Sequence, residues 1–319
     1  MSMSNYPNGF ETGVLIRGVP LTQTHPGRTF WVSDSSTGLL KGEKGGADVS
    51  SAGTFHRPFA TVSYAISRCF TDRGDKIFVK PRYTGTLGSA AAIAASVAGV
   101  AVIGLGSGSN RPTFTFDTAT TATLTVTAAN VAFSNCRFVA NFADIATLID
   151  VSAAGDGLTF QDCLFTDTST ILNAVDFITL ATGANDFAMY NCKVVGKSAS
   201  NDSVVTGVAH DGFVLNGCHM QFDVAQTAVV AMIISTGNVT NYSIKDCFFR
   251  SNVDAAEFID FNGTANSGET TYCRFSSLDV AGAVTACMDA TGGHTFESYV
   301  AGEADTYGIV GGGTAYNNA

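Results

Sequence analysis

The sequence predicts an all-β fold, a single-stranded right-handed parallel β-helix with a short N-terminal cap helix and an extended N-terminal arm. Three observations predict it. A Cys-centred motif occurs six times at spacings of 26 to 29 residues, a second apolar segment recurs in step with it, and no amphipathic helix of ordinary length separates the copies. Self-similarity at a fixed period indicates a repeat architecture, and the missing helices disfavour βαβ units.

The Cys-centred motif predicts a strand that ends in a corner. In most copies the residues five and three positions before the Cys are apolar and their neighbours are small or polar, which is the period of a strand with one buried face. The residue directly before the Cys is Asn, Asp or Gly in five of six copies, and these residues tolerate left-handed backbone angles. The six motif cysteines are Cys136, Cys163, Cys192, Cys218, Cys247 and Cys273.

The second apolar segment lies between the motif copies, for example at Leu148–Val151 and Phe258–Phe261. Each repeat therefore holds three short strands, and stacked coils lie about 4.8 Å apart. The motif cysteines should form an internal column. A column of disulfides or metal ligands is the alternative, but free Cys packs as a small hydrophobe and the chain has no CxxC or Cys/His cluster of metal spacing. We predict buried, reduced thiols, no metal site and no cofactor.

The chain divides into four predicted segments. Residues 1–53 carry no repeat and are predicted to form an N-terminal arm or docking segment. Residues 54–75 contain apolar side chains at helical spacing and should form a capping helix over the open end of the solenoid. The β-helix is predicted over 76–291, and a Gly-rich C-terminal tail over 292–319.

Three segments carry a resemblance to a known family. The Pro58-Phe-Ala-Thr helix, the Gly74-Asp-Lys-Ile-Phe-Val-Lys-Pro81 strand and the Val102-Ile-Gly-Leu-Gly106 run, followed by Arg-Pro-Thr, resemble the start of pectate-lyase-like parallel β-helix proteins. That resemblance covers roughly residues 55 to 291. The opening Tyr6-Pro-Asn-Gly-Phe10, with the Ile-Arg-Gly-Val-Pro and Phe-Trp-Val segments after it, resembles the front of phage virion structural proteins. The resemblance implies the fold; many members cut polysaccharides and others are inert virion parts.

The charge balance excludes some partners. A net charge of −10 and a pI near 4.8 argue against nucleic acid and against anionic membrane surfaces. Residues 89–106 are Ala- and Gly-rich and do not predict a transmembrane segment. Met1–Phe10 has no basic start or apolar core, so we expect no Sec export and a cytoplasmic, reducing site of assembly.

Candidate catalytic residues are few. Asp260 and Asp289 occupy the same column in adjacent coils, and Asp150 lies further along it. Two carboxylates one coil apart could form a retaining-glycosidase pair; the alternative is a pair of solvated acids. We assign no catalytic residue and expect the chain not to be an enzyme.

A second column of apolar residues predicts assembly. In the third strand two neighbouring columns are both apolar, so one of them should point outward. An exposed run of that size is unusual on a monomer, which predicts a homotrimer; burial under the chain's own arm or a loop is the alternative. The predicted oligomer interface comprises Leu148, Phe177, Val204, Met232 and Phe258.

Together these features predict a non-enzymatic phage virion structural protein, a trimeric capsid decoration (cement) protein that stabilises the head shell. We place it on the capsid surface of the virion, assembled in the host cytoplasm and bound to the major capsid protein lattice. The alternative is a tailspike-like polysaccharide-binding or depolymerising β-helix protein, which the single Trp and the missing acid cluster disfavour; a bacterial adhesin ranks third. The predicted capsid-docking residues are Phe10, Ile16, Arg17, Phe30 and Trp31.

Overall fold

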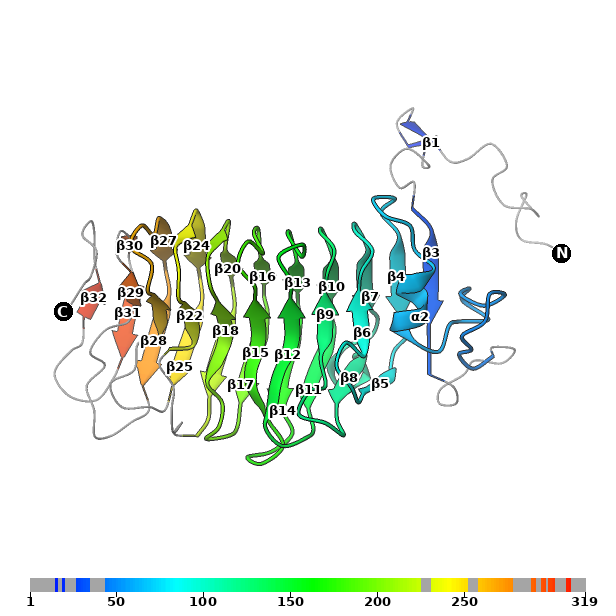
Figure 1. Cartoon of the computed structure of the whole chain (residues 1–319), viewed down its shortest axis with the longest axis horizontal. Helices are drawn as coiled ribbons and strands as arrows, with labels where there is room; N and C mark the ends of the chain where they lie inside the picture. The colour runs from blue at the N-terminus through cyan, green and yellow to red at the C-terminus, as the bar shows by residue number, and fades with distance from the viewer. Residues whose placement is uncertain are drawn as a thin grey trace.

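The computed structural model describes residues 15–16, 19–20, 27–34, 44–224, 231–251, 258–277, 288–290, 294–296, 298–301 and 308–310. Three long sheets of mostly parallel strands run side by side along the molecule, and from β4 to β29 each coil contributes one strand to each sheet (Figure 1). The predicted right-handed parallel β-helix is confirmed. None of the described helices is long and apolar enough to cross a membrane.

We name the sheets I, II and III in the order in which the chain visits them within a coil. Sheet I contains β3 (Thr29–Val32), β4 (Lys76–Val79), β7 (Ala101–Gly104), β10 (Ala132–Ser134), β13 (Thr159–Gln161), β16 (Ala188–Tyr190), β20 (Val214–Asn216), β24 (Tyr242–Lys245), β27 (Gly268–Thr271) and β30 (His294–Phe296). Sheet II contains β5 (Thr84–Leu87), β8 (Thr113–Phe116), β11 (Arg137–Ala140), β14 (Leu164–Asp167), β17 (Lys193–Gly196), β21 (His219–Phe222), β25 (Phe248–Ser251), β28 (Arg274–Ser277), β31 (Ser298–Ala301) and β32 (Gly308–Val310).

Sheet III contains β6 (Ile93–Ala95), β9 (Leu124–Val126), β12 (Ile145–Val151), β15 (Ala174–Leu180), β18 (Ser203–Gly207), β22 (Ile233–Ser235), β26 (Ile259–Phe261) and β29 (Met288–Ala290). Two small pairs complete the described strands: β1 (Leu15–Ile16) with β2 (Val19–Pro20), antiparallel, and β19 (His210–Asp211) with β23 (Val239–Thr240), parallel.

The corner between sheets I and II lies at the residue before each motif Cys, as predicted. All six of these residues have positive φ, from 51° at Asn191 to 66° at Gly217. The Asn135 side-chain amide donates to the carbonyls of Gly104 and Gly106 in the preceding coil, both at 2.8 Å. Asn135 therefore supplies both the left-handed backbone and a bond between coils.

Columns of identical or similar side chains fill the interior. The Phe138 ring stacks on Phe114 at 5.4 Å and on Phe165 at 4.9 Å, so neighbouring coils bring like residues into contact. The described cysteines are free and buried, and Cys163 Sγ donates to the Phe133 carbonyl of the preceding coil at 3.5 Å. Burial raises the pKa of the Cys163 thiol well above its ordinary value. The predicted column of reduced, buried thiols is confirmed for these residues.

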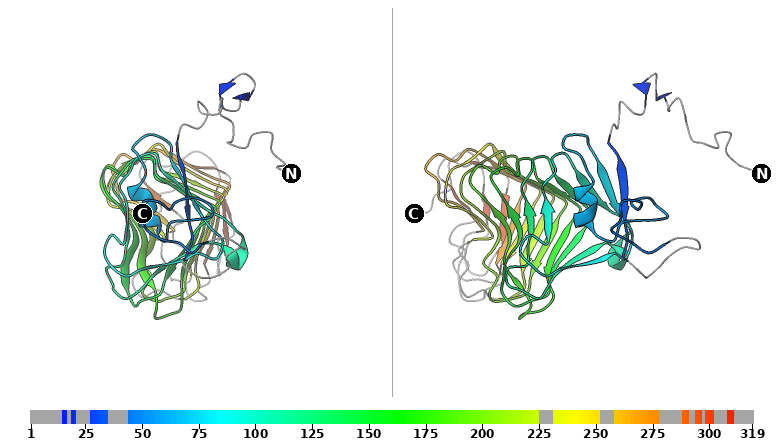
Figure 2. Two further views of the ribbon diagram at one scale, coloured as in Figure 1. Left: turned by 90° about the vertical axis from the view of Figure 1, so that its right-hand side faces the viewer. Right: turned by 45° about the vertical axis from the view of Figure 1, so that its right-hand side comes forward.

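The N-terminal end is closed by the predicted helix. The α-helix α2 (Val62–Ser67) begins after Thr61, whose hydroxyl accepts from the Tyr64 N–H at 3.1 Å. Its buried face contacts β3, β4 and β6 and lies over the end of the interior, as Figure 2 shows. A capped end keeps the first coil from exposing its apolar side chains.

Two predicted segment boundaries require correction. β3 pairs in parallel with β4, so the solenoid already begins inside the segment 1–53 that was predicted as an arm. At the other end β30 and β31 continue sheets I and II within the predicted tail 292–319, and β32 pairs antiparallel with β31. The alternation of only four residues at 29–32 was too short to distinguish a strand from an arm.

The predicted oligomer interface is also corrected, because its residues belong to the interior. Leu148, Phe177, Val204 and Met232 are 0% exposed and Phe258 is 1% exposed in the single chain. The Phe258 ring lies 5.3 Å from the interior ring of Phe275 in sheet II. In sheet III two successive side chains are both buried in each of these coils, for example Leu148 with Ile149 inside β12 and Phe177 with Ile178 inside β15. The strict alternation on which the interface prediction depended does not hold there.

Candidate functional site

The outer face of sheet III carries the carboxylates considered in the sequence. Asp260 pairs in register with Asp289, so their backbones lie in adjacent coils as predicted. Asp260 is only 5% exposed and accepts from the Asn262 amide at 3.0 Å; the side chain of Asp289 lies outside the described residues. Asp150 is exposed and is separated from Asp260 by three strands. The structure therefore brings Asp150 into no pair with Asp260.

A further carboxylate on this face, Asp176, accepts hydrogen bonds from two hydroxyl groups. Ser203 Oγ donates to Asp176 Oδ1 at 2.7 Å and Thr206 Oγ1 donates to the same oxygen at 3.1 Å. Burial raises the pKa of Asp176, although these hydrogen bonds oppose the shift. Burial, together with the charge of Asp176, also raises the pKa of Asp202. Across the described part of the chain, no group of three or more His, Cys, Asp or Glu is arranged to hold a metal.

The outer face of sheet II carries the opposite charge. One register column, which we call the sheet II row, runs through six consecutive strands from β11 to β28. Its members alternate along each strand with buried residues such as Phe138 and Phe249, so they point outward. At about 4.8 Å per strand the row is about 24 Å long. It consists of Arg137, Leu164, Lys193, His219, Phe248 and Arg274.

Arg250 extends the charge of this row. It lies in β25, two residues after Phe248, and also points outward. Seven of the 17 Lys and Arg residues lie beyond position 83, and four of these seven are on the outer face of sheet II: Arg137, Lys193, Arg250 and Arg274. The one acid in the strands of this sheet, Asp167, is 0% exposed. By contrast, the strands of sheet III contain no Lys or Arg.

The cations of this face have no carboxylate partner among the described residues, where the one ion pair joins Arg73 to Asp75. The Nε atoms of Arg137 and Arg250 are shielded from solvent and bond to no described group. Burial, followed by the charges of Lys193 and Arg250, lowers the pKa of His219. Guanidinium groups without a carboxylate partner give this face a positive charge, and such a charge attracts anions.

The C-terminal part of the row borders a hollow. Its volume is about 240 Å³, and its lining includes Asp246, Phe248, Tyr272 and Arg274. Tyr272 is 50% exposed, and the Phe248 ring meets the His219 ring edge-on at 4.8 Å. Partly exposed aromatic rings beside a guanidinium and a carboxyl group offer both a stacking surface and hydrogen-bonding groups.

The predicted docking residues lie elsewhere. Phe30 and Trp31 are half-buried in β3: the Trp31 ring stacks on Phe78 at 5.1 Å, and the Phe30 ring lies 5.8 Å from Phe59. Both rings stabilise the first coil. Phe10 and Arg17 lie outside the described residues; Ile16 belongs to β1, and its side chain is not among those described.

The sequence contained a signal for the sheet II row that was not used. Each member follows a motif Cys directly, and this residue is basic or aromatic in five of the six copies; Leu164 is the exception. The motif was interpreted through its buried positions. The residue between two buried positions points outward, and its character is therefore set by solvent or by a partner.

Comparisons with known proteins found similar solved structures and no related family or curated protein. No family model matches the chain, and no curated protein matches it. Among solved structures it is similar to a pectin methylesterase in complex with a hexasaccharide, with 12% identity, a TM-score of 0.46, and 88% of this chain and 90% of that chain covered. Another complex of pectin methylesterase has 10% identity with the same TM-score and coverage. A rhamnogalacturonan lyase has 11% identity, a TM-score of 0.46, and 85% and 87% covered.

The expectation that the chain is not an enzyme is corrected by these comparisons. The solved structures to which the chain is similar include enzymes, a pectin methylesterase and a rhamnogalacturonan lyase, so that expectation is not upheld. At 10–12% identity the likeness concerns the fold alone and assigns no reaction to this chain.

Proposed function

We propose that the protein is a polysaccharide-binding β-helix protein that binds an acidic polysaccharide along the sheet II row. The observation that carries the proposal is the collection of Arg137, Lys193, Arg250 and Arg274 on one outer face, without an exposed acid in its strands, in a chain of net charge −10. Charge of one sign on one face attracts a polymer of the opposite sign and orients it.

The geometry favours a polymer over a small ion. The four cations lie on four of the six strands, β11, β17, β25 and β28, so no single cavity gathers them. A chain that carries an anion on successive units can meet several of them at once, and the linked contacts reinforce one another. Each contact alone is exposed and weak.

The aromatic groups favour a glycan over a nucleic acid. Phe248 and Tyr272 line the hollow beside Arg274, where a sugar ring could stack while its carboxylate meets the guanidinium. A phosphate-backbone binder has a strongly basic domain, and this chain is acidic. Binding of nucleic acid is therefore the alternative result that the test below can reveal.

The proposal is tested with a variant in which Arg137, Lys193, Arg250 and Arg274 are each changed to Gln. Calorimetry or a retardation gel measures binding to polygalacturonate, to neutral dextran and to single-stranded DNA. We expect wild type to bind polygalacturonate and not dextran, and the variant to bind at least about tenfold more weakly. A matched control changes Lys76 and Lys245 of sheet I to Gln and should bind like wild type.

Two results would overturn the proposal. Equal binding by wild type and the sheet II variant would remove the row as the site, and tighter binding to DNA than to polygalacturonate would replace glycan by nucleic acid. New reducing ends in the same reactions would add depolymerisation to binding, with the carboxylates of sheet III as the first residues to substitute.

A second candidate role is a structural part of a phage particle, favoured by the resemblance of Tyr6–Phe10 and the segments after it to the front of phage virion proteins. In this proposal the N-terminal segment before β3 binds the major capsid protein lattice of the virion, and the chain acts there as a homotrimeric decoration protein. The trimer needs contacts other than the five buried residues. Imaging of an assembled particle tests the proposal, because density absent from the head surface would contradict it.

A further inference from the structure

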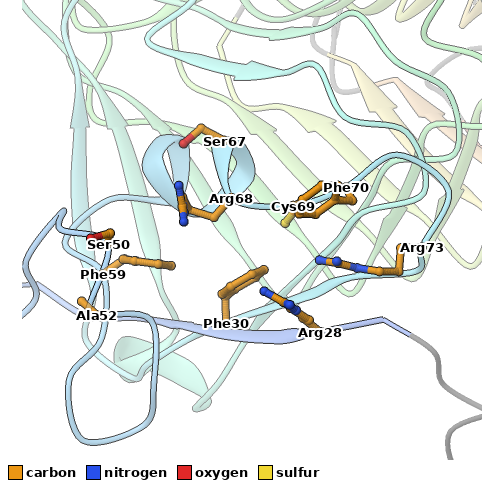
Figure 3. A pocket seen from close by; sticks show the side chains of 10 residues that line it. All are labelled: Arg28, Phe30, Ser50, Ala52, Phe59, Ser67, Arg68, Cys69, Phe70 and Arg73. Carbon is orange, nitrogen blue, oxygen red and sulfur yellow. The ribbon is translucent and has the colours of Figure 1, made fainter.

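A cavity of about 500 Å³ lies at the N-terminal end, away from the sheet II row. It is bounded by β3, the segment 50–59, the end of α2 and the segment that follows it (Figure 3). Three arginines line it, Arg28, Arg68 and Arg73; in Figure 3 Arg68 extends from the end of α2, and Arg28 and Arg73 lie on the other side of the Phe30 ring. Three phenylalanines, Phe30, Phe59 and Phe70, supply the apolar part of the wall.

Asp75 fixes one side of the cavity. Its carboxylate is 0% exposed and accepts from Arg73 Nε at 2.7 Å and Arg73 Nη2 at 2.6 Å. It also accepts from the backbone N–H groups of Arg28 at 2.6 Å and Phe70 at 2.8 Å. Burial alone would raise the pKa of Asp75, but these hydrogen bonds lower it, so the carboxylate stays charged.

This arrangement orients Arg73 without using all of its donors. The guanidinium lies over the Phe70 ring, 4.4 Å from its centroid, and is held there by two bonds to one carboxylate. A planar guanidinium that is clamped in this way has little rotamer entropy left to lose on binding a ligand. Arg73 is therefore preorganised, and Asp75 balances its charge.

The other two arginines carry the excess charge. Arg28 and Arg68 form no ion pair with any carboxylate in the described part of the chain, and both are exposed to the cavity mouth. Among the described residues, no acidic side chain lines the cavity. The cavity therefore has a net positive charge of about two beside three aromatic rings, and Phe70 keeps 60% of its surface exposed at its edge.

We propose that this cavity binds a small organic anion that carries a carboxylate or phosphate group on a ring. The guanidinium groups of Arg28 and Arg68 take the anionic group, because planar donor pairs match carboxylate and phosphate oxygens. The rings of Phe30 and Phe70 contact the ring of the ligand. Cys69 also lines the cavity, but burial followed by the Asp75 charge raises the pKa of its thiol to about 12, so it stays protonated and acts only as wall.

The experiment titrates the full chain with galacturonate, glucose 6-phosphate and inorganic phosphate at constant ionic strength and follows binding by calorimetry. We expect measurable binding of at least one of the two ring-bearing anions, with inorganic phosphate weaker than glucose 6-phosphate. Which of the two binds better distinguishes a sugar acid from a phosphosugar as the natural class. Failure of both to bind at about 10 mM overturns the proposal.

Variants locate the site. Changing Arg28 and Arg68 together to Gln should weaken binding at least about tenfold, because both charges are lost while the Arg73–Asp75 pair remains. Phe70→Ser should weaken the ring-bearing anions and leave inorganic phosphate unchanged. Arg57→Gln, an exposed arginine at the same end that does not line the cavity, is the control and should bind like wild type.

The outcome is independent of the polysaccharide proposal. The variant with four Gln substitutions in sheet II leaves every lining residue of this cavity in place and should bind the small anions like wild type. Loss of small-anion binding in that variant, or unchanged binding in the Arg28/Arg68 variant, would place the anion elsewhere and overturn the assignment.

Discussion

The outer faces of sheets II and III are built in the same way and carry opposite charge. Both consist of short parallel strands in register over one interior, and both carry outward positions between buried ones. Sheet II points Arg137, Lys193, Arg250 and Arg274 outward, whereas the strands of sheet III contain no Lys or Arg. Packing determines the inward residue of each pair and leaves the outward one free. Outward side chains that share one sign of charge on one face therefore carry information about the partner that binds there.

The largest expected effect is on the free energy of unfolding. It distinguishes a buried carboxylate that the fold requires from an exposed one that it does not. Asp167 at the end of β14 is 0% exposed and accepts from the N–H groups of Ala174 at 3.0 Å and Lys197 at 2.8 Å and from the Asn201 amide at 2.9 Å. Asp167→Ala leaves these donors buried and unpaired and should lower the free energy of unfolding by about 3 kcal/mol. Urea unfolding measures it. Asp150→Ala on the exposed face of sheet III should change it by less than about 0.5 kcal/mol, and similar losses would contradict the distinction.

The same carboxyl group should make stability depend on pH. Burial raises the pKa of Asp167 to about 6, against the lowering effect of its hydrogen bonds. The native state then holds the proton more tightly than the unfolded state, so stability falls as pH rises from about 4 to about 6. We expect the loss over that window to be on the order of 2 kcal/mol, and smaller in Asp167→Ala than in wild type. Unfolding midpoints at several pH values measure it. Identical slopes in the two proteins would show that Asp176 and Asp202, whose pKa values are also raised, dominate.

A transplant of charge tests whether position or net charge matters for the polysaccharide. The variant with four Gln substitutions in sheet II loses four positive charges. Adding Thr125→Lys, Asp150→Lys and Ile234→Lys on sheet III restores the same net charge, because replacing the Asp contributes two. We expect affinity for polygalacturonate to stay about tenfold below wild type, because the restored cations lie on the wrong face. Recovery to the wild-type affinity in calorimetry would mean that binding reports only overall charge.

The sequence was sufficient to predict the buried side chains of the interior and insufficient to predict what lies on the outer surface. Six copies of one motif defined the strand, the corner at Asn135 and its equivalents, and the thiol column, because buried positions repeat under the same packing constraint. The interface prediction failed at Phe258 and its equivalents, because two successive residues are buried in the coils of sheet III and break the alternation on which the prediction depended.

The sheet II row can be found from the residue after each motif Cys, because this residue points outward. The N-terminal cavity cannot, because Arg28 and Arg68 are 40 residues apart in the chain and are brought together by the pairing of β3 with β4 and the placement of α2. That pairing closes a loop of more than 40 residues, and no local pattern predicts its partner.

The smallest expected effect tests the row at one residue. Burial and the charges of Lys193 and Arg250 lower the pKa of His219, while Asp223 opposes them, so His219 is neutral in the free protein at neutral pH. A bound polyanion favours the charged imidazole, so affinity should rise as pH falls below the ordinary His value of about 6.5, by about threefold. The carboxylates of a polyuronate stay charged over this range because their pKa is far lower.

His219→Gln should bind with an affinity that does not change with pH, whereas substitution of the exposed His56, outside the row, should leave the pH dependence intact. If the two variants behave alike, the titrating group is not in the row, and the contact of His219 with Phe248 at 4.8 Å is then only part of the packing of sheet II.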